Sequence, residues 1–294
     1  MAQSPAHRFG QMIGELLEGA IAPLLAQFAV EHGLYLDQKE PRPCRTGRKC
    51  TWADSSGNTH DLDFVLERGG DKNQVGTPVA FIETAWRRYT KHSRNKVQEI
   101  QGAILPLAQK HEAVQPFKGA ILAGVFTKGA LDQLRSLGFS VVYISYHSIV
   151  AAFKKLQIPA DFDEDTSDSD FSVKVRALEE LSTSQRNRLK KEILKQHRPE
   201  IDQFLEHLSI AVMRRIEMIV VLVLHGGHHE SPDVSDAIVY IQSYQEDSVT
   251  KPVIRYEIQV RYSNGDSIVG TFQFKDDAIQ FLNGQETHAH KAKG

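Results

Sequence analysis

The sequence predicts an α/β protein, with a mixed β-sheet flanked by helices and then a helical and antiparallel β extension. Apolar runs alternate with segments of helical periodicity over about the first 156 residues, as in strands joined by packed helices. The last third instead carries short strands, two of them joined through Asn264-Gly265, the strongest short hairpin signal. A chain of 294 residues, 41% hydrophobic and 24% charged, is long enough to bury a substantial core.

The first elements are a helix and three strands. Helical spacing of apolar residues predicts a helix over about residues 8–31, which Pro23 is expected to kink or split. A hairpin is expected over Cys50–Ala53 and Thr59–Glu67, and the next strand over Thr77–Trp86.

Helices and strands then alternate. A helix is expected to begin near Ser93 and to continue through Leu107. The nearly all-apolar run Gly119–Phe126 is typical of a strand buried on both faces. This alternation predicts a parallel part of the sheet, and it continues with a helix at Gly129–Leu137, a strand at Phe139–Tyr146 and a helix at Ser148–Leu156.

An acidic stretch, residues 161–172, divides the chain. It is rich in Asp and Ser and has no apolar periodicity, a composition typical of a linker. We therefore expect a core over residues 1–160 and a C-terminal domain over residues 173–294. The elements expected there are Val173–Leu181, a basic helical stretch over Ser182–Ile216 interrupted near Pro199, strands at Met218–Leu224, Ile238–Tyr244, Val253–Tyr262 and Ser267–Phe274, and a helix at Asp276–Leu282.

Composition indicates a cytoplasmic protein. No apolar run reaches the roughly 20 residues that span a bilayer, and Met1–Gly10 lacks the apolar centre of a signal peptide. Cys44 and Cys50 lack the spacing of a structural zinc site, which leaves two free thiols. The net charge of −2 argues against a protein that coats nucleic acid indiscriminately, but it leaves local basic faces open.

Two acidic residues interrupt apolar strands. Asp63 and Glu83 each lie in such a run, where a carboxylate is costly to bury unless it is paired or binds a metal. Asp61 faces opposite to Asp63 on a strand, and Asp63 is preferred because Phe64–Leu66 continue the strand beyond it. One or two carboxylates, completed by water and phosphate oxygens, are typical ligands of Mg²⁺.

A basic segment follows the second acid. Ser93, a helix cap, together with Arg94 and Lys96, could hold a backbone phosphate, since helix N-termini favour anions. Such contacts position DNA without reading its sequence. The basic residues within this short segment are Arg87, Arg88, Lys91, His92, Arg94 and Lys96.

The order of elements resembles the PD-(D/E)XK nucleases, the core shared by most type II restriction endonucleases. The resemblance covers about residues 8–156: a helix, a hairpin bearing Asp63, a strand bearing Glu83, then helix, strand, helix and strand. It implies a restriction-endonuclease-like fold in which Asp63 and Glu83 are catalytic metal ligands. The further ligands that it implies are the backbone carbonyl of Thr84 and an acid of the first helix, Glu18 or Glu15.

One position departs from the family. The Lys expected two residues after the Glu is Ala85 here. In this superfamily the Lys sometimes migrates to the following helix, which makes Lys96 the third catalytic candidate, with Lys91 and Arg87 behind it. Arg87 cannot act as a base because its guanidinium stays protonated.

The function expected from this resemblance is Mg²⁺-dependent hydrolysis of double-stranded DNA by a type II restriction enzyme, with Mn²⁺ as substitute metal. The expected partners are DNA, a second copy of the chain in a homodimer and a cognate DNA methyltransferase, with no membrane. Residues expected to bind DNA phosphates are Arg87, Lys91, Ser93 and Arg94. The alternatives are a DNA-binding or assembly protein with a degenerate nuclease site, which Ala85 favours, and a DNA-repair nuclease.

Overall fold

The computed structural model describes residues 4–90, 93–246 and 253–289. It divides into two compact units. Unit 1 comprises residues 1–111 and 116–208, and unit 2 comprises residues 112–115 and 209–294.

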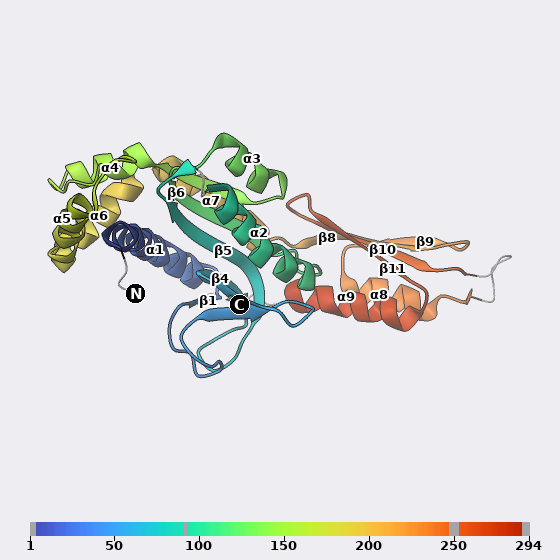
Figure 1. Cartoon of the computed structure of the whole chain (residues 1–294). Helices are drawn as coiled ribbons and strands as arrows, with labels where there is room; N and C mark the ends of the chain where they lie inside the picture. Colours follow the sequence, from blue (N-terminus) through green and yellow to red (C-terminus); the bar gives the residue numbers. More distant parts are fainter. Residues whose placement is uncertain (1–3, 91–92, 247–252, 290–294) are drawn as a thin grey trace. The chain divides into compact units, whose positions relative to one another are not determined.

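A mixed five-stranded sheet lies at the centre of unit 1 (Figure 1), so the predicted α/β class is confirmed. Its strands, in spatial order, are β1 (Leu34–Gln38), β4 (Phe64–Arg68), β5 (Thr77–Arg87), β6 (Phe117–Gly124) and β7 (Ser140–Ser145). The first three are antiparallel neighbours, whereas β5, β6 and β7 are parallel. Strand β1 is an element that the sequence pattern did not predict.

Helices cover both faces of this sheet. On one face, α2 (Ser93–Lys110) and α3 (Lys128–Ser136) share a hydrophobic cluster with β5 and β6. The long helix α1 (Pro5–Glu31) lies across β5 on the other side (Figure 1). Pro23 lies inside α1 and does not split it. The helix α4 (Tyr146–Lys154) follows β7 and contacts β6 and β7.

Within the described residues, α1 is the one helix long and apolar enough to cross a membrane. Core helices and signal sequences pass the same test. Its apolar side chains are buried at helical spacing, from Phe9 through Leu16 to Phe28. The structure is therefore compatible with a soluble protein or with a signal sequence, and the cytoplasmic location stays a prediction.

The expected strand Thr59–Glu67 is broken in two. Its first part, β3 (Thr59–Leu62), pairs only with β2 (Cys50–Ala53) in a separate two-stranded sheet, among the residues described. The chain bends at Asp63, and β4 then enters the main sheet. The acid selected from the sequence thus lies at the junction of two strands.

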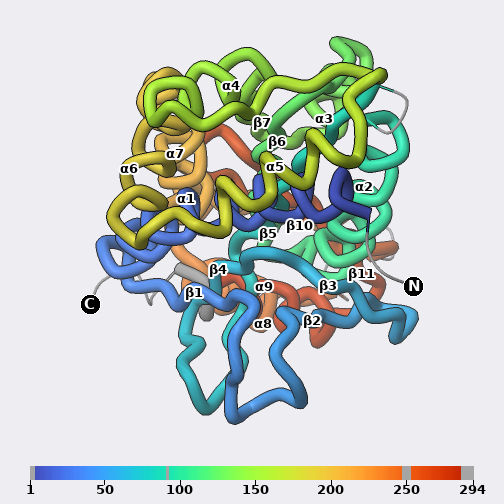
Figure 2. The backbone as a smooth tube through the Cα atoms, turned by 60° about the vertical axis from the view of Figure 1, so that its left-hand side comes forward, coloured from blue at the N-terminus to red at the C-terminus, as the bar shows by residue number. Residues whose placement is uncertain are grey.

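The division between the units differs from the expected linker. Instead of a linker over 161–172, helix α5 (Asp168–Glu179) begins there with Ser167 as its cap, and the division falls within α7 (Arg198–Val212). Helices α5 and α6 (Thr183–Lys195) lie against α1 (Figure 2). The physical reason is burial of apolar side chains, since Phe171, Leu178, Leu189 and Ile193 are each at most 1% exposed.

Unit 2 is a four-stranded antiparallel sheet with two helices. Its elements are β8 (Ile216–Val223), β9 (His228–Ser231), α8 (Val234–Ser243), β10 (Tyr256–Tyr262), β11 (Ser267–Phe272) and α9 (Lys275–Ala289). The strand expected at Ile238–Tyr244 is wrong, because most of it belongs to α8. Asp233 caps that helix by accepting the N–H of Asp236 at 2.8 Å, which favours a helix over the strand that the apolar residues suggest.

Unit 2 also contains a repeat that the sequence pattern did not predict. Each half is two strands followed by a helix, and the strand order β11-β10-β8-β9 is symmetric about the central β8–β10 pair. The helices share the sequence Asp-Ala-Ile, at 236–238 and 277–279. Ala237 and Ala278 are fully buried, as are Ile241 and Leu282, each four residues later.

Candidate active site

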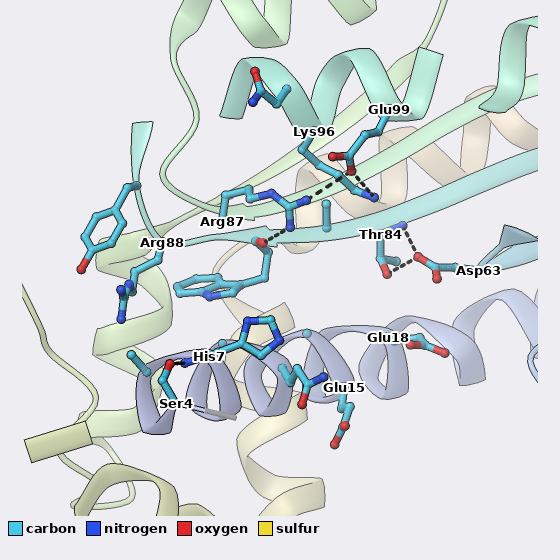
Figure 3. Close-up of a pocket in the computed structure, with 18 of the residues that line it drawn as sticks. Ser4, His7, Glu15, Glu18, Asp63, Thr84, Arg87, Arg88, Lys96 and Glu99 are labelled. Carbon is cyan, nitrogen blue, oxygen red and sulfur yellow. Dashed lines mark hydrogen bonds and ion pairs between the residues drawn. The ribbon is translucent and has the colours of Figure 1, made fainter. Parts of the chain in front are cut away.

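A pocket of about 870 Å³ lies in unit 1, along the last residues of β5. The walls come from the N-terminal half of α1, from β5 and from the first turns of α2 (Figure 3). It brings together residues that are up to 95 positions apart in sequence. The charged residues that line it are Glu15, Glu18, Lys39, Asp63, Arg87, Arg88, Lys96 and Glu99.

Asp63 lies at this pocket because the chain bends there. Its Oδ2 accepts two hydrogen bonds from Thr84, one from the backbone N–H at 2.8 Å and one from the hydroxyl at 2.7 Å (Figure 3). The carboxylate is therefore held against β5 in one orientation. The predicted ligand Thr84 is thus adjacent to Asp63.

Glu83 is buried beside Asp63. The strand register pairs Phe64 with Ile82, so Asp63 and Glu83 occupy the next positions outward, as the sequence hypothesis required. The backbone N–H of Asp63 donates to Oε1 of Glu83 at 3.1 Å. Glu83 is 6% exposed, and burial, followed by repulsion from the Asp63 carboxylate, raises the pKa of Glu83 to about 8.

Lys96 of α2 lies close to Glu83. Its Nζ lies 3.8 Å from Oε2 of Glu83 and 3.5 Å from Glu99, and its side chain is 19% exposed. A lysine at position 85 would lower stability, because Ala85 is buried in the hydrophobic cluster with Val97 and Leu122. The cation that faces Glu83 thus comes from the following helix.

The residues expected to contact DNA phosphates differ in whether they line the pocket. Arg87 lines the pocket but pairs with Glu99 at 3.4 Å. Ser93 is wrong as a phosphate contact, because it is fully buried and its hydroxyl donates to the carbonyl of Thr90. Arg94 is exposed and is not among the lining residues. Lys91 lies outside the described residues.

The acids of α1 face the pocket from the opposite wall. Glu18 and Glu15 both line it (Figure 3). Burial and then the Asp63 carboxylate raise the pKa of Glu18, and Lys39 opposes this. The carboxylates of Glu18 and Asp63 are therefore close enough to repel each other, as expected of an outer ligand. Glu15 instead lies 3.7 Å from Arg8.

The donor chemistry fits a hard divalent cation. In the part of the chain that is described, no three His, Cys, Asp or Glu side chains gather closely enough to hold a metal. Mg²⁺ does not require such a cage, because it commonly takes one or two carboxylates and completes its shell with water and phosphate oxygens. Asp63 and Glu83 supply two carboxylates whose mutual repulsion a cation would relieve.

Several lining residues were not selected from the sequence. Glu99 could have been, because it lies one turn after Lys96 on the same face of the helix. Lys39 and His7 carried no local signal, since only the pairing of β1 with β4 and the packing of α1 against β5 bring them to the pocket. Arg88 was noted only as part of a basic segment.

Comparisons with known proteins do not identify the chain. No protein-family model matches it, and no curated protein matches it. It is similar to a crystal structure described as a protein of unknown function, AF1548, with 10% sequence identity and a TM-score of 0.27, over 61% of this chain and 97% of the other. A likeness this distant carries no argument about function.

Proposed function

We propose that the protein is a Mg²⁺-dependent endonuclease that hydrolyses phosphodiester bonds of double-stranded DNA. The observation that carries this proposal is the convergence of Asp63, Glu83 and Lys96 from three separate segments. Asp63 N–H lies 3.1 Å from Oε1 of Glu83, and Lys96 Nζ lies 3.8 Å from its Oε2. Two adjoining carboxylates with one ammonium group are suited to phosphodiester hydrolysis.

The order of elements supports a restriction-endonuclease-like core. A helix, the Asp at the entry to one strand, the Glu on its antiparallel neighbour, a helix and a parallel strand follow one another from α1 to β6. This is the order on which the resemblance to PD-(D/E)XK nucleases rests. Lys96 would then take the part of the Lys that Ala85 replaces.

The roles of the residues follow from their positions. Asp63 and Glu83, with the Thr84 carbonyl and Glu18 as further candidates, would hold Mg²⁺, which when bound stabilises charge on phosphate oxygens and favours hydroxide. Thr84 fixes the orientation of Asp63 through its two hydrogen bonds. Lys96, close to Glu83, would donate a hydrogen bond that positions the attacking water. The oxygen of that water would form a new bond to phosphorus and lose a proton to solvent. The P–O bond to one sugar oxygen would break, and that oxygen would take up a proton.

Plasmid cleavage tests the proposal. Supercoiled DNA is incubated with Mg²⁺, and wild type is compared with Asp63→Ala and Glu83→Ala. We expect nicked and linear products from wild type and from neither of these two variants. Asp61→Ala is the matched control, because Asp61 is an exposed acid of the preceding strand that pairs with Lys49. Cleavage by both site variants at the wild-type rate would refute the assignment.

A second candidate is a DNA-binding or assembly protein with a degenerate site. It is favoured by two observations: the burial of Ala85 in the hydrophobic cluster and the lack, among described residues, of a ready three-ligand group. This candidate predicts DNA binding without cleavage in either Mg²⁺ or Mn²⁺. The same plasmid assay, with a gel-shift measurement, separates the two candidates.

A restriction role makes further demands. The protein would act as a homodimer, so that two sites address two strands, and a cognate methyltransferase would protect host DNA. Light scattering reports the oligomeric state. Cleavage of unmodified DNA but not of DNA from the source cell favours restriction, whereas equal cleavage of both favours a repair nuclease.

A further inference from the structure

The end of the pocket away from Asp63 differs in charge from the catalytic end. Figure 3 shows Arg88 with Ser4 and His7 at one end, and Asp63 with Glu18 at the other. Arg88 lies four residues beyond Thr84, so the two ends are separated by roughly 13 Å at about 3.3 Å per residue. The pocket thus has an acidic end and a basic end.

Arg88 is a partly buried cation without a counter-ion. Its guanidinium stacks over Tyr89, 4.3 Å from the ring centroid, and over Phe171 at 4.7 Å. No carboxylate of the described residues lies within ion-pair distance, and its Nη1 is buried without an acceptor. The neighbouring Arg87, by contrast, pairs with Glu99. A guanidinium that is partly removed from water and has no anion beside it is destabilising, so an anion supplied by a ligand would stabilise it.

A second donor in this wall also has no acceptor. The indole Nε1 of Trp86 is buried and unpartnered, and Trp86, 7% exposed, lines the pocket. The N-terminus of the 27-residue helix α1 forms the adjoining wall through Ser4 and His7. Its partial positive charge favours an anion there. The Arg88 guanidinium and the N-terminus of α1 therefore both favour negative charge at this end of the pocket.

We propose that Arg88 binds a phosphate group of the DNA strand, a few nucleotides from the phosphate that is cleaved. Arginine suits this role because its planar fork matches phosphate oxygens, and the stacked rings hold it in place. The ring contacts also orient the side chain before DNA arrives. This inference rests on the proposed function. It implies that the DNA strand extends across the pocket from the Asp63 end to the Arg88 end.

The phosphate has two possible sources. One is an internal phosphodiester, which every DNA strand carries. The other is a terminal 5′-phosphate, a monoester with more charge and more free oxygens. Duplexes that differ only in their 5′ ends distinguish these sources.

Binding is measured by fluorescence anisotropy with 3′-labelled 20-base-pair duplexes bearing either a 5′-phosphate or a 5′-hydroxyl. The buffer contains EDTA, so the result does not depend on cleavage. Wild type is compared with Arg88→Gln and with the control Arg188→Gln, since Arg188 is exposed on α6 and lies outside the pocket. We expect Arg88→Gln to bind roughly tenfold more weakly at low salt, with a salt slope lower by about one.

The outcomes are distinct. A wild-type preference for the 5′-phosphate that Arg88→Gln abolishes identifies a terminal phosphate, and equal weakening for both duplexes identifies an internal one. Binding by Arg88→Gln within twofold of wild type, with an unchanged salt slope, overturns the inference. If Arg88→Gln does not fold, Arg88→Lys is judged instead, with threefold weakening required.

The proposed function fails separately from this inference. Arg88-dependent binding without any Mg²⁺-dependent cleavage would remove the hydrolytic function alone. Cleavage by wild type, with binding that does not depend on Arg88, would remove the phosphate site alone.

Discussion

Replacing Glu83 with Gln should change how the stability of unit 1 depends on pH. The pKa of Glu83 is raised to about 8, first by burial and then by Asp63, whereas an ordinary Glu has a pKa near 4.3. Between these values the folded protein holds a proton that the unfolded chain does not. The free energy of unfolding therefore falls as the pH rises through this window.

One proton sets the size of the effect. The slope is at most about 1.4 kcal/mol per pH unit. From pH 5.5 to 7.5 the wild type should lose roughly 2–3 kcal/mol relative to Glu83→Gln, which stays neutral throughout. Solvent screening does not reduce this much, because Glu83 is 6% exposed.

Urea denaturation followed by tryptophan fluorescence measures the difference. Both tryptophans of the chain, Trp52 and Trp86, belong to unit 1, so the signal reports that unit. Histidines and other groups away from the site that titrate in this range contribute equally to both proteins and cancel in the comparison. The variant is a close match, since its amide oxygen can still accept the N–H of Asp63.

Mg²⁺ should suppress the pH dependence. A cation bound by Asp63 and Glu83 requires both carboxylates ionised, so Mg²⁺ affinity should rise with pH up to about 8 and the added stability should be lost in Glu83→Gln. Parallel pH profiles for the two proteins without metal would refute the buried-carboxylate reasoning. A profile for wild type that Mg²⁺ leaves unchanged would count against the metal site.

Other variants test further parts of the structure. Lys96→Met should lower the cleavage rate at least about a hundredfold and leave DNA affinity within threefold, whereas Lys128→Met, at an exposed lysine of α3, should change neither. Arg42→Met should lower the free energy of unfolding by about 3–5 kcal/mol, because it removes the buried ion-pair partner of Glu67, 2.5 Å away. Urea denaturation measures this loss, and a loss under about 1 kcal/mol would contradict the expectation. A hydrogen bond from His60 holds the pKa of Asp54 down to about 2, so stability is lost as the pH falls from about 4 through 2. The melting temperature of Asp54→Asn should therefore depend less on pH over that range than the melting temperature of wild type.

The cost of burying charge makes the two acids recognisable in the sequence. Asp63 and Glu83 stand out because each interrupts an apolar run, and the strand register then brings them to neighbouring positions. Lys96 could be proposed because helix geometry fixes which residues of α2 face β5. Ser93 was predicted to bind a phosphate because it begins a helix. The prediction was wrong because the first residue of a helix can face the core as easily as solvent, and Ser93 is buried.

Misplaced elements show where local patterns compete. The residues of α8 are rich in β-branched and aromatic side chains, which favour a strand, but the Asp233 cap and the burial of Ala237 and Ile241 on one face favour the helix. The acidic run before α5 suggested a linker. Its charge is confined to the solvent side, while Phe171 packs against Phe9 of α1 with ring centroids 5.7 Å apart.

The sequence by itself determined the class of the fold, most of the elements from α1 to α4 in their order, and the two acids, because periodicity and the cost of buried charge are properties of a few neighbouring residues. It did not predict β1 or the break at Asp63. Only the tertiary structure decided which groups share the pocket with them. Arg88 lacks an acidic partner among the described residues, and Arg87 has one in Glu99. Adjacent arginines with the same chemistry differ in this way because their partners come from other segments of the chain, whose position depends on packing.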